Sequence, residues 1–340
     1  MELHAYARIV SGNRWRSRRN GMITGATAAW PILPLEEWRD TCATLHLWAQ
    51  IVGKVRLAKT PWLNHGWHVA LYVNARGLTS SLIPCDGRGF EIQFDFAQHV
   101  LDIQTTDGTG ARIALCPQSV AEFHDRLMAA LGKLGFAVTI SDLPCEIAGA
   151  IPFTHDHEHA SYDAEYANRF WRVLLQVDRV FKHFRTGFLG KCSPVHFFWG
   201  SFDLAVTRFS GRRAPTFSGN VPGVAAKVMQ EAYSHEVSSA GFWPGGQGVD
   251  ASFYSYAYPS PPGFERAKVQ PGAAFYNGDL GEFLLPYEAV RCARDPDTAL
   301  LKFLTSTYEA AAETAGWERA ALECPSGAAG VCRNIVVPEI

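Results

Sequence analysis

Three histidines alternate with other residues in the polar stretch 151–162, whose sequence is IPFTHDHEHASY. If this stretch is extended, His155, His157 and His159 point the same way, and in a helix the first and last of them share a face. Neutral imidazole is a common ligand of zinc and iron, so we identify these three histidines as candidate metal ligands. The alternative is a solvated linker that leads into the next helix.

A second group, the candidate catalytic residues, lies in the second half of the chain: His196, Asp203, Glu231 and His235. Glu231 and His235 are four residues apart, so both face one site on the helix expected there. His196 and Asp203 are seven apart and lie on opposite faces of a regular strand, unless a bulge or a late strand start intervenes. Two histidines with a carboxylate suit iron or zinc, and a His–Glu pair suits acid–base catalysis without metal. The alternative is a histidine hydrogen-bonded in an aromatic core.

Aromatic residues and one arginine near these groups are the candidate ligand-binding residues: Trp199, Arg208, Trp243, Tyr254, Tyr256 and Tyr258. The three tyrosines alternate, so they share one face of a strand and could line a pocket for a flat or apolar ligand. A packed interface between two halves of the chain explains them equally well. Arg76 and Arg208 end matching strands, where each could bind a carboxylate or phosphate or pair with an aspartate of the core.

The order of the expected elements predicts an α+β fold built by internal duplication. Residues 30–150 and residues 163–322 each read as a helix, an antiparallel sheet and a second helix, and residues 151–162 join them. The two halves agree better in the order and spacing of their elements than in residue identity. The alternative is one mixed α+β domain whose halves are only superficially alike.

Two local predictions concern the candidate site. Alternating apolar residues predict a strand over residues 68–76. The second half also has an insert at residues 215–248, in which we expect a helix over about 223–239 and then a glycine-rich FWPGG loop. Long inserts that contain a helix are often lids or binding elements.

The composition sets the broad class of the protein. Hydrophobic residues make up 47% of the chain, charged residues 19%, and the net charge is −2. This balance gives no general attraction to nucleic acid or to an anionic membrane, and no apolar run has the roughly 20 residues of a membrane span. The eight cysteines form no C-x-x-C pair, so we expect reduced thiols in a soluble, cytoplasmic protein.

Both ends of the chain differ from its middle. Residues 1–29 contain five arginines and lack the apolar core of a signal peptide, so we expect a disordered basic extension, with Met22 as an alternative start. An arm that contacts nucleic-acid phosphates is a lesser alternative. Residues 323–340 are expected to form an irregular tail that contributes little to stability.

Several stretches resemble an uncharacterised bacterial family that is known only as a domain of unknown function. The signatures are HFFWGSFDLAVTRFSGR and EAYSHEVSSAGFWPG, and the resemblance covers about residues 30–322. It implies a soluble bacterial protein that forms a single unit. It brings no activity, cofactor or catalytic residue to this chain.

Two functions from different classes follow from these observations. The first is an enzyme that acts on a small organic molecule in an aromatic pocket of the second half, with a divalent metal, Zn or Fe, as a possible cofactor. The second is a binding protein without catalysis that holds a small ligand between the halves. Clustered histidines and carboxylates favour the enzyme, and the lack of a known catalytic motif favours the binding protein. In both cases the expected partner is a small molecule, not nucleic acid or a membrane.

Overall fold

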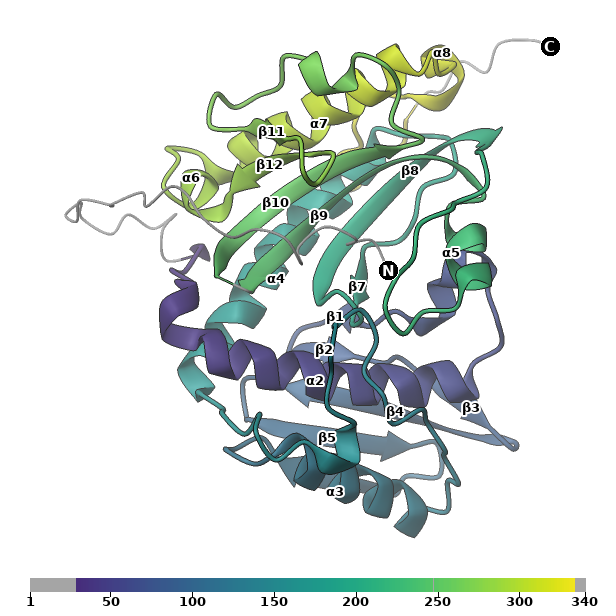
Figure 1. The fold of residues 1–340 in the computed structure, drawn as a ribbon, viewed down its shortest axis with the longest axis vertical. Coiled ribbons are helices and arrows are strands. Elements are labelled where there is room, and N and C mark those ends of the chain that lie inside the picture. The colour runs from purple at the N-terminus through teal and green to yellow at the C-terminus, as the bar shows by residue number, and fades with distance from the viewer. Residues whose placement is uncertain (1–28, 247, 334–340) are drawn as a thin grey trace.

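The computed structural model describes residues 29–246 and 248–333, and the predicted basic extension lies almost wholly outside them. The fold is α+β, as the sequence predicts, with two antiparallel six-stranded sheets and helices packed on each (Figure 1). None of the described helices combines the length and the apolar character that a membrane span requires.

Helix α2, Leu35–Lys59, lies between the two sheets (Figure 1). Every residue from 47 to 56 is buried, which requires neighbours on all sides of the helix. It contacts β3 of the first sheet and β9 and β10 of the second. This helix therefore joins the two halves of the chain through one continuous core.

The first sheet has the strand order β1-β2-β4-β5-β6, with β3 paired to the other part of β4. Its strands are β1 Tyr72–Val73, β2 Gly77–Thr79, β3 Ile83–Cys85, β4 Arg88–Asp95, β5 Val100–Thr105 and β6 Gly110–Ala114. Helix α3, Val120–Lys133, starts at a capping box formed by Ser119 and Glu122. Trp48 of α2 stacks on Phe123 of α3 at 4.7 Å, so the two helices share one core.

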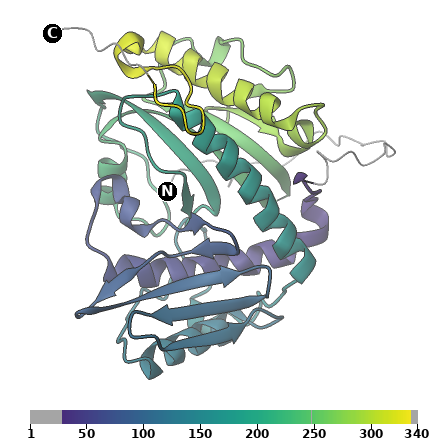
Figure 2. The ribbon, with the colours of Figure 1, turned by 180° about the vertical axis from the view of Figure 1, so that it is seen from behind.

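The second sheet has the order β11-β12-β10-β9-β8-β7. Its strands are β7 His196–Phe198, β8 Asp203–Arg213, β9 His235–Gly246, β10 Val249–Tyr258, β11 Phe275–Asn277 and β12 Glu282–Pro286. The helices of this half are α4 Ala164–Thr186, α5 Ala226–Ala232, α6 Tyr287–Arg291, α7 Pro296–Thr314 and α8 Arg319–Leu322. Figure 2 shows α4 and α7 lying over one face of this sheet, and both contact its strands.

Both halves begin with a long helix, continue with an antiparallel sheet and then return to a helix. Their sheets differ in detail. The second has the longer central strands, and in the first β3 pairs with β4 outside the main strand order. The internal duplication stays a prediction.

The strand predicted over residues 68–76 is mostly wrong. A 3-10 helix, η2, occupies Asn64–Val69, and β1 keeps only two residues of the expected strand. His65 and Gly66 both have left-handed backbone angles, with φ of 58° and 70°, which turn the chain. The Nδ1 atom of His68 accepts a bond from the Leu63 amide at 3.2 Å and stabilises this turn.

The long helix predicted over about 223–239 is also wrong. Helix α5 has only seven residues, and β9 begins at His235. The glycine-rich FWPGG segment belongs to β9 as well, not to a loop. Because β9 pairs with both β8 and β10, hydrogen bonds to distant segments override the local helical pattern.

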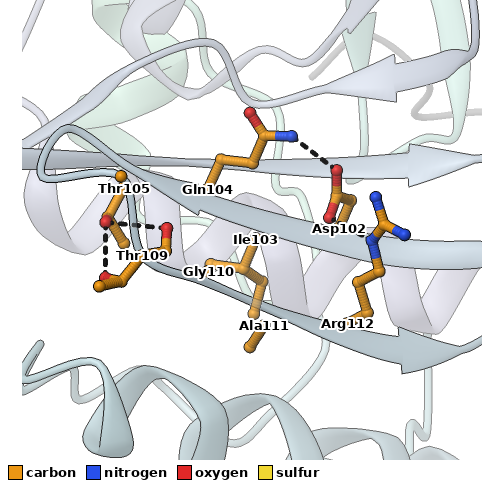
Figure 3. A pocket seen from close by; sticks show the side chains of 9 residues that line it. Asp102, Ile103, Gln104, Thr105, Thr109, Gly110, Ala111 and Arg112 are labelled. Carbon is orange, nitrogen blue, oxygen red and sulfur yellow. Dashed lines mark hydrogen bonds and ion pairs between the residues drawn. The ribbon is translucent and has the colours of Figure 1, made fainter.

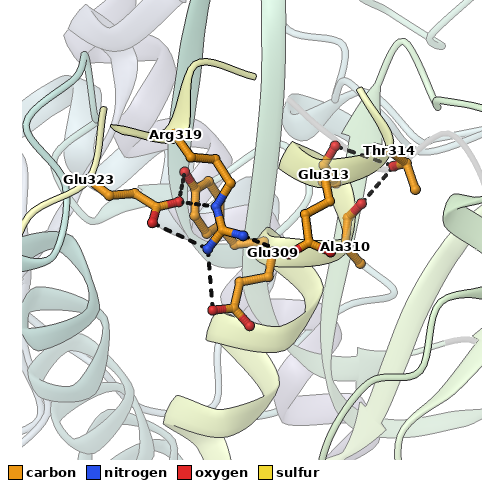
Figure 4. A network of polar contacts seen from close by, with 8 residues as sticks. Glu309, Ala310, Glu313, Thr314, Arg319 and Glu323 are labelled. Atoms are coloured by element: carbon orange, nitrogen blue, oxygen red, sulfur yellow. Dashed lines mark hydrogen bonds and ion pairs between the residues drawn. The ribbon is translucent and has the colours of Figure 1, made fainter. Parts of the chain in front are cut away.

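The first part of the predicted tail docks on the second half. The Cys324 amide donates to the Gly187 carbonyl at 3.3 Å, and the Gly327 amide donates to the Thr186 hydroxyl at 2.9 Å, both at the end of α4. Figure 4 shows the charged network beside these contacts, in which Arg319 binds Glu323 and Glu313 at 2.6 Å each. Residues 334–340 lie outside the described part of the chain.

Candidate functional site

The turn between β7 and β8, residues 199–202, is a point of contact between the two halves. The carbonyl oxygen of Gly200 lies 2.8 Å from Nε2 of His46 on α2. Burial lowers the pKa of His46 to about 4, so its ring is neutral and donates this bond. The indole of Trp199 donates to the carbonyl of Val69 at 2.8 Å. The turn is thereby fixed against α2 and η2.

Asp203 follows this turn and is completely buried at the start of β8. Its carboxyl group accepts hydrogen bonds from the Ser201 hydroxyl and the Tyr254 hydroxyl. Burial raises the pKa of Asp203, because a charged carboxylate is disfavoured away from water. Asp203 is thus a carboxyl group biased toward its neutral form.

Glu146 brings a second carboxyl group to the same turn. Both of its carboxyl oxygens are buried, and its backbone has a left-handed φ of 62°. A Cβ atom built on Gly200 would meet Oε1 of Glu146 at 2.2 Å, so only glycine permits this approach. Burial raises the pKa of Glu146, and the negative charge of Asp203 adds to the shift. A carboxyl group on a cavity wall whose pKa is raised is typical of functional sites.

A cavity of about 170 Å³ lies between α2, η2, α5 and the β7–β8 turn. Its apolar walls include Leu57, Trp62, Val69, Phe198, Trp199 and Val228. Three polar side chains also line it: Lys54, His68 and Glu146. Lys54 is only 7% exposed, and burial lowers its pKa and that of His68. The cavity is therefore largely apolar, with a few polar groups on its wall, as ligand pockets commonly are.

A larger hollow of about 380 Å³ lies over the β5–β6 hairpin of the first sheet (Figure 3). Its walls come from residues 102–105 and 108–112 alone, which form one hairpin. Asp102 is bound by both Arg112 and Gln104, so the polar groups there already bond to each other. We place the candidate site in the smaller cavity, where distant segments converge and the carboxyl groups are perturbed.

Comparison with known protein families gives a match. A family model described as a family of unknown function, DUF5996, matches residues 30–324. The chain belongs to this family. The match extends over both halves, so the cavity between them lies within the family's own boundaries. Neither the curated proteins nor the solved structures contain a match to the chain.

The predicted cluster of His196, Asp203, Glu231 and His235 does not surround this cavity. His196 is buried among the rings of Trp67, Tyr72 and Phe198, at 5.3–5.7 Å. Its two ring nitrogens have no hydrogen-bond partner in the described structure, so the expected hydrogen-bonded core histidine is not what is observed.

Glu231 and His235 are not a pair on one helix face, because α5 ends at Ala232. Glu231 accepts a hydrogen bond from the Trp62 indole at 2.8 Å, which places it at the rim of the cavity wall. His235 lies on β9, with its ring 6.0 Å from the ring of His65. The expected acid–base pair is thus separated by the end of the helix.

The predicted ligand-binding residues are dispersed over the second sheet. Trp199 lines the cavity, whereas Trp243 packs in another cluster with Tyr254 and Leu284. The hydroxyl of Tyr256 lies 3.2 Å from that of Tyr233, and the hydroxyl of Tyr258 donates to the carbonyl of Pro215.

The two predicted arginines bind groups of the protein itself. Arg76 pairs with Asp95 in the first sheet. Arg208 donates to the carbonyl of Phe184 at 2.5 Å, and its guanidinium lies 3.6 Å from the centre of the Phe184 ring. The prediction that both arginines end matching strands is wrong, because Arg76 lies between β1 and β2 and Arg208 lies in the middle of β8. In each case a contact with the protein itself explains the residue.

The structure gives no geometric support to the predicted histidine ligands. His159 bonds to Asp156 at 2.8 Å, while His155 and His157 are exposed. Across residues 29–246 and 248–333, no three His, Cys, Asp or Glu side chains lie close enough to hold a metal ion. The short η3 helix, Phe153–His155, breaks the alternation that would have aligned the three rings.

The sequence patterns did not identify Glu146, Lys54 and His68 as residues of the candidate site. Lys54 had a visible signal, because it stands in the apolar run IVGKV of a helix that is otherwise buried. Glu146 had none, since it reaches the site through a left-handed backbone angle in a segment without periodicity. Its neighbour Gly200 is 54 positions away, and that proximity exists only in the folded chain.

Proposed function

We propose that this protein is an enzyme that transfers a proton to or from a small, largely apolar organic molecule bound in the cavity between α2 and the β7–β8 turn. The observation that carries the proposal is the placement of the Glu146 carboxyl group on the wall of this cavity, next to buried Asp203. Such an arrangement supports general acid–base catalysis, in which a positioned group needs a pKa near the working pH.

The cavity volume limits the size of the ligand. A cavity of about 150 Å³ with apolar walls holds benzene, and the cavity here has about 170 Å³. We therefore expect a molecule with a body of about one aromatic ring. The rings of Trp62 and Trp199 favour a flat ligand, and the polar groups on the wall favour a carbonyl or hydroxyl substituent.

The roles of the polar residues follow from their pKa shifts. Glu146 has a raised pKa, so its protonated form persists to higher pH and can act as the acid. Asp203 adds to this shift only in its ionised form, and it does not line the cavity. The lowered pKa of His68 keeps its ring neutral, so it can position a ligand oxygen without adding charge.

Binding can be tested with four probes of one ring: phenol, indole, benzaldehyde and acetophenone. Val228 lines the cavity, so Val228→Trp should fill it and weaken binding of these probes at least tenfold. Ala226→Trp is the matched control, because Ala226 is exposed on the same helix. Binding measured by calorimetry or ligand-observed NMR should be lost in the first variant and kept in the second. Equal binding in both variants would remove the cavity as the site.

Catalysis is tested separately, by deuterium exchange at the methyl group of acetophenone in D2O. Proton transfer at Glu146 should make this exchange faster with the protein than with buffer alone. Glu146→Gln should abolish the acceleration and keep probe binding within about threefold, because the amide has nearly the same shape. Probe binding without faster exchange in the native protein would leave the binding protein as the function.

A further inference from the structure

A second group of residues, at the junction of β1 and β7, concentrates positive charge away from the cavity. Leu71 beside β1 pairs with Phe197 of β7, and this bridge brings Tyr72 next to His196, with ring centres 5.7 Å apart. The guanidinium of Arg56 lies 5.4 Å from the centre of the Tyr72 ring. Arg56 and His196 are 8% and 1% exposed, so both basic side chains are buried together.

Arg185 on α4 belongs to this group, because its charge acts on His196, and its side chain also bonds to the Cys192 thiol. Several other polar atoms of the group have no partner. Nη1 of Arg56, Nε of Arg185 and both ring nitrogens of His196 are buried without a hydrogen bond in the described structure. The other side of the Arg56 guanidinium is fixed, since its Nε donates to the carbonyl of His68 at 2.6 Å. Buried donors of charged groups are normally satisfied, and leaving them unsatisfied costs free energy. Two such guanidinium donors, together with the unpartnered ring nitrogens of the neutral His196, therefore call for a ligand.

No negative group of the described chain balances these charges by an ion pair. The salt bridges found within residues 29–246 and 248–333 include neither Arg56 nor Arg185. The charge of Arg185 acts on the Asp178 carboxylate. Asp178, however, forms its ion pair with Lys182, at 2.6 Å.

The remaining acidic groups nearby are neutral. Burial raises the pKa values of the Tyr72 hydroxyl and the Cys192 thiol, so neither supplies a negative charge at neutral pH. Burial, together with the charges of Arg185 and Arg56, lowers the pKa of His196 to about 3. The region thus contains two permanent cations and a histidine that only a nearby anion would allow to become charged.

We propose that Arg56, Arg185 and His196 form a binding site for an oxyanion, the carboxylate or phosphate group of a small molecule, at the junction of β1 and β7. The anion would accept hydrogen bonds from the two guanidinium groups and from a ring nitrogen of His196. Because these residues do not line the cavity, this site is independent of the proposed catalytic function.

The test uses the full-length protein, dialysed free of buffer anions and titrated with phosphate or acetate at constant ionic strength set by sodium chloride. A bound oxyanion should raise the pKa of His196, followed by NMR with His196→Gln used for assignment. It should also raise the melting temperature. Comparing the affinities for phosphate and acetate shows whether the site recognises a phosphate or a carboxylate group. The anion that binds more tightly identifies the preferred group.

Variants make the test specific. Arg185→Gln should weaken binding of the preferred anion at least tenfold, because it removes a charged donor. Arg39→Gln is the matched control, since Arg39 is exposed on α2, the same helix as Arg56, and binding should stay within twofold. If Arg185→Gln fails to fold, Arg185→Lys and His196→Gln replace it, and each should weaken binding. The proposal is wrong if neither anion moves the His196 resonances, or if binding is unchanged in these variants.

Discussion

Each of the two sheets buries an aspartate at the end of a strand, and the partners of the two carboxyl groups are opposite in kind. Asp95, at the end of β4, pairs with Arg76 and accepts from the amides of Ala97 and Gln98. Asp203, at the start of β8, accepts from two hydroxyl groups. Both side chains are 0% exposed, but Asp95 pairs with a half-exposed arginine near the surface and Asp203 lies deeper in the core, so partners and depth both differ.

The pKa values of the two aspartates move in opposite directions. Burial acts to raise the pKa of Asp95, but the amides and Arg76 together lower it below its ordinary value. Burial raises the pKa of Asp203, and its hydroxyl partners do not reverse the shift. The first sheet therefore holds its buried carboxylate charged as part of the structure. The second holds a carboxyl group closer to neutral, next to Glu146 and the cavity.

The largest expected effect separates these two aspartates. Asp95→Asn should destabilise the protein by about 3 kcal/mol, because it removes one partner of a buried pair, and the partial exposure of Arg76 keeps the loss at the low end. Asp203→Asn should cost less than about 1 kcal/mol, since an amide resembles a protonated carboxyl group. Urea denaturation at pH 7 measures both values. A loss at Asp203 as large as that at Asp95 would contradict the comparison.

The same two variants should respond to pH with opposite signs. The lowered pKa of Asp95 gives stability that is present above its unfolded value of about 3.9 and is lost as the pH falls through the folded value. The raised pKa of Asp203 gives stability below that unfolded value, which is lost as the pH rises through the folded value. The cost of Asp95→Asn should therefore grow as the pH rises from about 2 to about 4 and then stay constant, and that of Asp203→Asn should shrink as the pH rises above about 4. Parallel pH curves would mean that both carboxyl groups are charged.

A smaller effect on stability is expected from replacing one glycine in α2 and one in α3. A Cβ atom on Gly53 of α2 would lie 2.2 Å from the indole nitrogen of Trp199, while Gly132 of α3 has open space around it. Gly53→Ala should cost about 2 kcal/mol, because overpacking outweighs the gain in helix propensity. Gly132→Ala should stabilise by about 0.5 kcal/mol.

The Gly53→Ala variant also sharpens the argument about the cavity, since Trp199 forms part of its wall. Probe binding should weaken in this variant and stay unchanged in Gly132→Ala. Thermal unfolding and calorimetry on the two proteins provide both measurements. If Gly53→Ala is as stable as the native protein, Trp199 is free to move, and the wall is not fixed as described.

Features set by neighbouring residues could be predicted from the sequence. The capping box of Ser119 and Glu122, the turn at residues 107–108 and the helical spacing of α4 all depend on positions within one or two turns. Asp163 caps α4 by accepting a hydrogen bond from the Tyr166 amide at 3.0 Å. The structure has each of these elements at the residues where the local sequence pattern indicates it.

Features set by distant partners could not be predicted in this way. Residues 235–246 carry a local pattern that suggested a helix and then a loop, but they pair with two strands instead. Of the predicted site residues, Trp199 lines the cavity because its own turn packs on α2. Glu146 depends on the absence of a side chain at Gly200, a constraint that no local pattern contains. The site is therefore a property of the contact between the halves.

The smallest expected effect concerns the hollow over the β5–β6 hairpin of the first sheet. Arg112 is 62% exposed and binds Asp102 at 3.1 Å, while Gln104 also donates to Asp102 at 2.8 Å. Arg112→Gln should change stability by at most about 0.5 kcal/mol, because an exposed ion pair gains little over its hydration and Gln104 keeps the carboxylate bonded. Binding of the one-ring probes should be the same as in the native protein, because Arg112 is far from the cavity wall in the fold. Urea denaturation at low and high salt, with calorimetry of probe binding, gives both results. A loss of probe binding in this variant would move the functional site to the first sheet and overturn the distinction between the two sheets.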